Sequence, residues 1–310
     1  MAASHCPSQA NNPCRQAHTL MSTAPRGETT LKQVSFDLGV TVHPARPTVQ
    51  GARAPRTLLL AHGYGCDQGM WHDLLPLLTQ HRCITFNQPG AGAGNPGAYD
   101  PVRHATLQGY AATLLDLVAE LAEPDLVLVG HSVSAMIGAL AAVQAPQAFG
   151  QLVMLCPSPS YLNDLPHYQG GFTAEQLDGL LQGLADGHSS WSHAMAPVIM
   201  ANPDRPALAA DLAARFCAMD PAIALRWARA TFLTDLRSVV PQVTVPTVVL
   251  QCREDAIAGP AVGEWMASQL PQGELHWLDA SGHCPQMSHP AEVARVLLSA
   301  LGTPGPPVSA

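Results

Sequence analysis

A serine that stands between an apolar run and a helix-compatible stretch restricts the folds open to this chain. Residues 126–129 read Leu-Val-Leu-Val, and residues 130–134 read Gly-His-Ser-Val-Ser, directly before another apolar stretch. A buried strand that turns sharply into a helix exposes such a serine hydroxyl at the helix N-terminus, where partial positive charge stabilises an oxyanion. The pattern predicts that Ser132 is a nucleophile. The alternative interpretation is a serine that only caps the following helix.

The last residue of this pattern is Ser134, where the usual G-x-S-x-G motif has glycine. Glycine lets the turn pack tightly against its neighbours, so only a small residue can replace it. Serine is the next size up after alanine, and we expect the sharp turn to be retained. The interpretation of Ser132 therefore depends on whether the other groups that a nucleophile needs follow in the right order.

A carboxylate follows Ser132 at the end of a second predicted strand. Residues 247–252 read Thr-Val-Val-Leu-Gln-Cys, an apolar run typical of a buried parallel strand, and Asp255 comes three residues later. Where a nucleophilic serine, its acid and its histidine occur along the chain in the order Ser, Asp, His, the acid stands on a loop after such a strand. We predict that Asp255 is the acid, with the adjacent Glu254 as its competitor.

A histidine follows the acid in the same manner. Residues 274–279 predict another strand, and His283 comes just after it. In a triad the histidine takes the serine proton and gives it to the leaving group, while the aspartate fixes the imidazole tautomer. The chain order therefore predicts a catalytic triad of Ser132, Asp255 and His283.

A His-Gly pair after an earlier apolar run predicts the groups that would bind an oxyanion. Residues 57–61 are such a run, and His-Gly-Tyr-Gly follows. This position supplies one backbone N–H donor and the residue after the nucleophile supplies the other, so we expect the amides of Tyr64 and Val133. His62 and His131 flank the predicted site, but neither follows the acid in the chain, and we interpret both as structural hydrogen-bonding residues.

Five short segments carry a more specific signal. They are residues 62–68 (HGYGCDQ), 130–138 (GHSVSAMIG), 161–164 (YLND), 168–172 (YQGGF) and 282–290 (GHCPQMSHP). Together they resemble the RsbQ family of α/β hydrolases, whose members include a bacterial stress-signalling protein and whose relatives include plant karrikin and strigolactone receptors. The resemblance extends from about Leu58 to Leu301.

This resemblance implies an α/β-hydrolase fold, in which a mostly parallel central sheet is flanked by helices and carries an inserted helical lid. It assigns the triad and the two oxyanion donors to the same five residues as the chain order does, and it implies a monomer. Triad chemistry itself needs no cofactor, and we expect none. One departure is Asn87, where related proteins commonly have aspartate. We interpret that position as structural.

Two functions are consistent with these residues. The first is a serine hydrolase that acts on a small, largely apolar ester or lactone. The second, implied by the resemblance, is a signalling or ligand-sensing protein with slow or single-turnover hydrolysis and a regulatory phosphatase as partner. Hydrolysis of a carbon–carbon bond is a lesser alternative within the same fold.

The alternation of strand-like and helical stretches predicts one α/β domain over residues 31–301, with the helical lid at about 160–240. Residues 1–30 are poor in core-forming residues and predict a disordered extension, within which Met21 is an alternative start; residues 302–310 predict a flexible tail. Within the domain we expect strands near 34–42, 57–61, 83–86 and 151–156, and a helix over about 106–122. Several apolar side chains of the lid are candidates to line a pocket, and we select Phe172, Trp191 and Phe232 from the set Phe172, Leu180, Trp191, Phe216, Trp227 and Phe232.

Charge and cysteine usage exclude other classes of protein. The net charge of −8, without a cluster of lysine and arginine, argues against nucleic acid and anionic membranes as partners. There is no run of eighteen apolar residues, and we predict no membrane span. The eight cysteines include no C-x-x-C pair, and the fourteen histidines lack a metal-ligand pattern. We therefore expect free thiols, no metal and a cytoplasmic protein.

Overall fold

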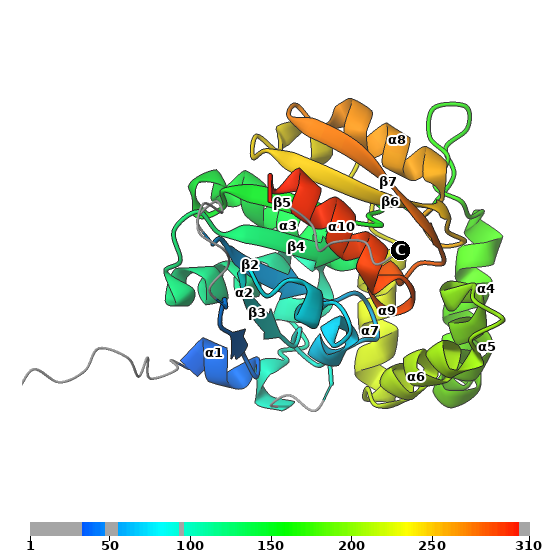
Figure 1. Ribbon diagram of the computed structural model, residues 1–310. Coiled ribbons are helices and arrows are strands. Elements are labelled where there is room, and N and C mark those ends of the chain that lie inside the picture. Colours follow the sequence, from blue (N-terminus) through cyan, green and yellow to red (C-terminus); the bar gives the residue numbers. More distant parts are fainter. Residues whose placement is uncertain (1–32, 47–54, 93–95, 304–310) are drawn as a thin grey trace, which may run out of the picture. The chain divides into compact units, whose positions relative to one another are not determined.

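A mostly parallel sheet organises the chain in the computed structural model, which describes residues 33–46, 55–92 and 96–303. The predicted extension 1–30 and residues 304–310 of the predicted tail lie outside the described residues. In the described part, β1 at one edge runs antiparallel to β3, and the other neighbours are parallel. The strand order is β1-β3-β2-β4-β5-β6-β7 (Figure 1). The strands are β1 (Thr41–His43), β2 (Thr57–Ala61), β3 (Arg82–Phe86), β4 (Val127–His131), β5 (Gln151–Leu155), β6 (Thr247–Glu254) and β7 (Gly273–Ser281).

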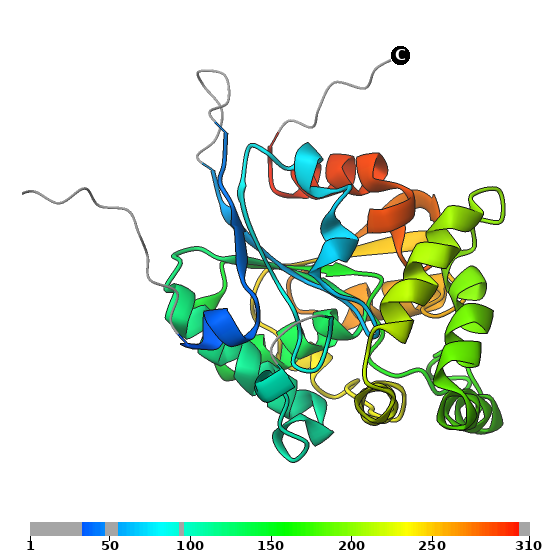
Figure 2. The ribbon, with the colours of Figure 1, turned by 90° about the horizontal axis from the view of Figure 1, so that it is seen from below.

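The central strands are apolar on both faces because helices cover both sides of the sheet. In β2, Leu58 and Leu60 belong to the apolar cluster that includes α10 (Pro290–Ala300). Leu59 belongs to the opposite cluster, which includes residues of three helices on the other side of the sheet (Figure 2) and of one helix inserted after β5. Such double burial is typical of parallel sheets and explains why these strands read as continuous apolar runs. The three helices of the second layer are α2 (Leu107–Leu121), α3 (Val133–Gln144) and α8 (Pro260–Gln269).

Helix α2 confirms the helix predicted over about 106–122. Its buried residues include Leu107, Tyr110, Leu114 and Leu117, at the three- and four-residue steps of one helical face. The helix ends at Leu121 and is followed by the capping residue Ala122, which adopts a left-handed conformation with φ of 49°. This stripe packs α2 against α3 on one face of the sheet.

The strand predicted near 34–42 is wrong over most of its length. The segment forms the short helix α1 (Gln33–Asp37), and only Thr41–His43 is a strand. The Glu120 carboxylate, from the end of α2, accepts hydrogen bonds from the backbone N–H groups of Val34 (3.0 Å) and Ser35 (2.9 Å). A carboxylate that binds the free N–H groups at a helix start stabilises the helix, and this partner stands 85 residues away in the sequence.

Four helices are inserted between β5 and β6, within the range 160–240 predicted to lack strands. They lie beside the carboxyl ends of the parallel strands (Figure 1). Thr173 and Gln176 form a capping box at the start of the first helix, and Asp220 caps the last. We call this segment the α4–α7 insertion: α4 (Ala174–Asp186), α5 (His188–Met200), α6 (Pro206–Cys217) and α7 (Pro221–Phe232). No helix among the described residues is long and apolar enough to cross a membrane.

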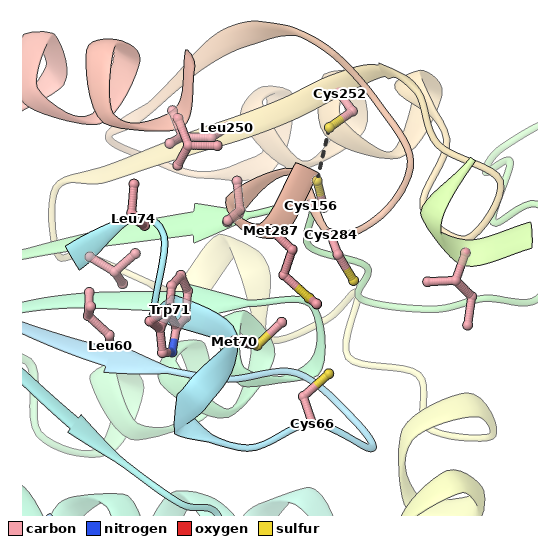
Figure 3. Packing of buried hydrophobic residues seen from close by; sticks show 14 of the residues in the cluster. Leu60, Cys66, Met70, Trp71, Leu74, Cys156, Leu250, Cys252, Cys284 and Met287 are labelled. Carbon is pink, nitrogen blue, oxygen red and sulfur yellow. Dashed lines mark hydrogen bonds between the residues drawn. The ribbon is translucent and has the colours of Figure 1, made fainter. Parts of the chain in front are cut away.

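Sulfur-containing side chains gather in the core next to the carboxyl ends of β5 and β6 (Figure 3). The Sγ atoms of Cys156 and Cys252 are 3.7 Å apart, and both side chains are buried. Burial raises the pKa of the Cys66 thiol to about 12 and that of Cys284 well above its ordinary value. These groups are therefore neutral thiols that pack as small apolar side chains. The described free cysteines are Cys66, Cys83, Cys156, Cys217, Cys252 and Cys284.

Candidate active site

The backbone between β4 and α3 makes the sharp turn predicted around Ser132. Ser132 has φ of 55° and ψ of −124°, a conformation that residues other than glycine rarely adopt. Its amide donates a hydrogen bond to the Leu155 carbonyl oxygen at 2.8 Å. A Cβ atom on Gly130 would lie 2.7 Å from the Ala135 nitrogen, so the turn requires glycine there. Backbone strain of this kind is concentrated at functional sites.

Ser134 does more than replace the motif's glycine. Its buried hydroxyl donates to the His62 carbonyl oxygen and accepts a hydrogen bond from Gln88 Nε2 at 2.9 Å. The hydroxyl therefore joins the serine turn to the loop after β2. Asn87, the departure noted in the sequence, has a structural contact as predicted, because its Oδ1 accepts a hydrogen bond from the Gln68 amide at 2.9 Å.

Asp255 occupies the loop after β6 with both carboxylate oxygens engaged. Its Oδ1 accepts hydrogen bonds from the amides of Ile257 (2.8 Å) and Ala258 (3.0 Å). Its Oδ2 lies 2.7 Å from His283 Nδ1. The competing carboxylate, Glu254, is exposed. The loop therefore orients the Asp255 carboxylate toward the histidine, as the chain order predicts.

His283 links the aspartate to the serine. Its Nε2 lies 2.7 Å from Ser132 Oγ, so two hydrogen bonds of equal length connect Ser132, His283 and Asp255. The residue before it, Gly282, has φ of 87°, which favours glycine. The His283 amide donates to the Ile199 carbonyl oxygen in α5 at 2.8 Å. All three side chains predicted from chain order thus meet at one point.

The loop after β2 passes directly beside Ser132. A Cβ atom on Gly63 would lie 3.2 Å from Ser132 Cβ, so the backbone approaches the serine closely only because residue 63 is glycine. Tyr64 follows in this loop, and Val133 is the first residue of α3. Neither the Tyr64 nor the Val133 amide has a hydrogen-bond acceptor among the described residues. Two backbone donors without protein partners therefore flank the serine.

The two flanking histidines make structural hydrogen bonds and are neutral. His62 Nε2 accepts from the Gln88 amide at 2.9 Å, and burial lowers the pKa of His62 to about 4. His131 Nε2 lies 2.7 Å from the His283 carbonyl oxygen, to which it donates. Burial, together with the charge of His283, lowers the pKa of His131 to about 3. Neither ring is arranged to take a proton from Ser132.

A narrow, mainly apolar cavity lies above the serine and contains most of the predicted pocket side chains. Trp191 and Phe232 line it, as do Leu180 and Phe216. The cavity has a volume of about 40 Å³. The lining residues are Tyr64, Cys66, His131, Ser132, Tyr161, Leu180, Trp191, Met195, Ile199, Leu212, Phe216, Thr231, Phe232, Ile257, His283 and Cys284.

Two of the predicted pocket aromatics do not line this cavity. Phe172 packs at an edge against the Tyr161 ring, with centroids 6.3 Å apart, and Tyr161 rather than Phe172 is among the described lining residues. Trp227 stacks on Tyr110 of α2, with centroids 5.3 Å apart, and is fully buried. Each of these rings is used in packing one element against another.

The sequence interpretation missed several lining residues that adjacency indicates. Cys284 directly follows His283, and Cys66 lies two residues after Tyr64. Tyr161 opens one of the segments that carry the family resemblance. Proximity to a predicted site residue is therefore the usable signal. The remaining lining residues come from helices whose orientation the sequence pattern leaves open.

One group of donor atoms in the described parts of the chain has the spacing of metal ligands. It consists of Cys156, Asp255 and His283, whose ligand atoms lie within 4.8 Å of one another. The carboxylate and the imidazole are already joined by the 2.7 Å hydrogen bond, and the thiol is buried and protonated because burial raises its pKa. This geometry is that of hydrogen-bonded side chains, and we assign no metal to it.

A mostly parallel sheet that presents a serine on a strained turn, followed along the chain by an aspartate and then a histidine that meet it, defines an α/β-fold hydrolase. The chain belongs to the Alpha/beta hydrolase family, whose model matches residues 58–296. The family and fold predicted from the sequence are thereby confirmed.

Similar proteins include esterases and receptors. The chain is 37% identical over 258 residues to a probable esterase of Oryza sativa subsp. japonica, a match that covers 83% of this chain and 94% of that protein. It is 36% identical over 245 residues to "Karrikin insensitive 2 receptor CA" of Petunia hybrida, covering 78% and 90%. A solved hydrolase structure from Oleispira antarctica is similar with a TM-score of 0.81 and 30% identity, covering 87% and 96%.

Proposed function

We propose that the protein is a serine hydrolase of small, largely apolar esters or lactones, with Ser132, His283 and Asp255 as its catalytic triad. The observation that carries this proposal is the chain of two 2.7 Å hydrogen bonds from Ser132 Oγ through His283 to Asp255, at the base of an apolar cavity. A nucleophile, a base within hydrogen-bond reach and a group that orients the base are the parts that acyl transfer needs.

The reaction has two steps. Ser132 Oγ attacks the carbonyl carbon while His283 Nε2 takes its proton, and the amides of Tyr64 and Val133 bind the oxyanion. The tetrahedral intermediate collapses, and His283 protonates the departing alkoxide, which leaves an acyl-serine. Water then attacks the acyl group as His283 takes a water proton, and the acid is released with that proton returned to Ser132. Each oxyanion donor contributes roughly 3 kcal/mol to transition-state stabilisation.

The α4–α7 insertion acts as the lid of this site and restricts the substrate. Its residues Trp191, Phe216 and Phe232 line the cavity together with Tyr161. Because these apolar side chains surround the space beside Ser132, they limit the size and the polarity of the substrate. A compact acyl group with apolar faces suits these walls better than a charged one.

Intact-protein mass spectrometry tests the proposal. The protein is incubated with p-nitrophenyl acetate and, separately, with a butenolide lactone, and the wild type is compared with Ser132→Ala and His283→Ala. We expect an acyl adduct that requires Ser132 and clears with turnover. Ser189→Ala is the matched control, because Ser189 also follows Gly-His but is exposed at the start of α5. Hydrolysis that survives Ser132→Ala overturns the mechanism.

The similarity to a karrikin receptor favours one alternative. In this second candidate the same triad turns over slowly, and ligand occupancy alters the insertion and its binding to a regulatory phosphatase. An adduct that persists on Ser132 supports this candidate, whereas one that clears quickly supports the plain hydrolase. The predicted cytoplasmic location and monomeric state remain predictions under both functions.

A further inference from the structure

The α4–α7 insertion contacts the loop that carries the proposed oxyanion donor Tyr64. The phenol oxygen of Tyr64 donates a hydrogen bond to the Ala224 carbonyl oxygen, in the first turn of α7, at 3.1 Å. Its ring makes edge contacts with Trp227 (5.5 Å between centroids) and Phe232 (5.8 Å) of the same helix. The side chain of the donor residue is therefore embedded in the insertion, while the preceding residue, Gly63, lies against Ser132.

The next residue, Gly65, packs directly against α6. Gly65 has φ of 72°, and a Cβ atom there would lie 2.3 Å from Cδ1 of Phe216. The Phe216 ring therefore lies on the bare backbone of the loop, in the last turn of α6. Glycine is required at this position both by its conformation and by the close approach of the ring.

Two residues further along, Asp67 pairs with an arginine of α6. Arg215 Nη1 lies 2.5 Å from Asp67 Oδ1, and Arg215 Nη2 lies 3.2 Å from Asp211 Oδ2. The Arg215 side chain is 18% exposed, so water screens this pair less than a surface ion pair. Asp67 Oδ1 also accepts from the Gly69 amide at 2.7 Å, which ties the ion pair to the backbone of the loop.

The far end of the loop is anchored to the sheet. Gln68 Nε2 donates to the Gly39 carbonyl oxygen at 2.8 Å, and its Oε1 accepts from Thr85 Oγ1 at 2.7 Å. The sheet thus holds the loop at residue 68. The last turn of α6 and helix α7, which we call the junction of α6 and α7, hold the loop at residues 64–67. Displacement of that junction would release the part of the loop that bears the Tyr64 amide.

We propose that the Arg215 guanidinium and the Tyr64 hydroxyl are positioning groups, which hold loop 62–67 so that the Tyr64 amide points at the oxyanion. The junction of α6 and α7 is then part of the catalytic apparatus rather than only a cover for the cavity. This inference rests on the proposed function. A misplacement of about 1 Å at such a donor costs on the order of 100-fold in rate.

The test uses full-length Arg215→Met and Tyr64→Phe, alone and combined, with p-nitrophenyl acetate as substrate and a short alkyl trifluoromethyl ketone as inhibitor. The ketone forms an oxyanion on Ser132 and so measures the donor directly. Arg229→Met, at an exposed arginine of α7, is the matched control, and Arg215→Lys is the conservative variant. Thermal melting of every variant separates unfolding from mispositioning.

We expect kcat to fall about 10- to 100-fold in Arg215→Met, with KM within about twofold of the wild type. Ketone affinity falls in parallel, Arg215→Lys recovers part of both losses, and Arg229→Met matches the wild type. Tyr64→Phe has a smaller effect in the same direction, because only one hydrogen bond is lost. Melting temperatures that stay near the wild type exclude a general loss of structure.

The positioning role is overturned if folded Arg215→Met and Tyr64→Phe retain wild-type kcat and ketone affinity. It is also overturned if KM rises while kcat and ketone affinity stay constant, since that pattern reports on substrate binding alone. Failure of the proposed function is read separately from Ser132→Ala. Hydrolysis that persists in that variant removes the proposed mechanism and the positioning role with it.

Discussion

His131 donates its Nε2 hydrogen to the backbone carbonyl oxygen of His283 across 2.7 Å. The two rings lie 5.2 Å apart and are tilted by 50°. Because burial keeps the pKa of His131 at about 3, the ring is neutral and its hydrogen bond is present throughout the neutral range. The last residue of β4 therefore supports the backbone of the proposed base, one position before the proposed nucleophile.

Replacing His131 by leucine removes this donor, so the buried carbonyl group of His283 loses the hydrogen bond from residue 131. We expect the free energy of unfolding to fall by about 1–3 kcal/mol and kcat to fall with it, because the base loses its backbone support. Urea denaturation and ester hydrolysis measure the two effects. His72→Leu, at an exposed histidine, is the matched control; equal stability of the two variants would contradict the interpretation.

Stability is expected to decrease as the pH falls below about 6.5. The pKa values of His62 and His131 are lowered to about 4 and about 3 in the folded protein, so the unfolded chain takes up protons in this range before the folded one does. Each histidine then lowers the free energy of unfolding by up to about 1.4 kcal/mol per pH unit. Its full contribution to stability is present only above the pKa that the histidine has in the unfolded chain. The midpoints of urea unfolding, measured from about pH 7 to about pH 5, give the slope of stability against pH. A slope that is unchanged in His62→Gln would refute this assignment for His62.

Asp255→Asn is expected to lower kcat by roughly four orders of magnitude. The amides of Ile257 and Ala258 point at Oδ1, so an asparagine places its carbonyl oxygen there and its NH₂ group toward His283. That NH₂ group holds the imidazole in the tautomer with hydrogen on Nε2, which cannot accept the proton of Ser132. Steady-state kinetics provide the measurement. Glu254→Gln in the same loop should retain activity, and a comparable loss there would mean that the acid is misassigned.

Ser134→Gly, which restores the common motif, is expected to destabilise the protein. The change removes the hydroxyl that binds the His62 carbonyl oxygen and Gln88 Nε2, which costs about 1–3 kcal/mol. Glycine in a helix adds about 1 kcal/mol relative to alanine. Ser134→Ala separates the two contributions, since it loses the hydroxyl alone. Thermal and urea unfolding of both variants provide the comparison, and a glycine variant as stable as the wild type would disprove the role of the hydroxyl.

The residues of the candidate site could be named from the sequence because each of them follows a predicted strand. Ser132 and Asp255 each stand just after a strand with a continuous apolar pattern, and His283 follows a strand of mixed polar and apolar residues. Parallel strands bring their carboxyl ends together. The walls of the cavity were less predictable. Phe172 and Phe232 are both aromatic residues of the inserted region, yet only Phe232 lines the cavity. The side of a helix or loop that faces a cavity depends on how the helices pack, which local spacing does not determine.

Helix α1 shows the same limit in the fold. Its residues alternate in a manner that predicts a strand, and the carboxylate that favours a helix belongs to Glu120, far along the chain. Local patterns therefore predicted an element such as α2, whose buried stripe is visible in its own sequence, and missed an element that depends on a distant partner.

The hydrogen bond from the His283 amide to the Ile199 carbonyl oxygen has a consequence for how such proteins diverge. A Cβ atom on Gly282 would lie 2.0 Å from the carbonyl oxygen of Met200, the next residue of α5, so the histidine loop and the end of α5 are fitted to each other. Substrate preference is often altered in evolution by exchanging an inserted segment as a module. In this chain such an exchange would also have to carry compatible residues at 62–67 and 281–283, because both loops are fitted to the insertion.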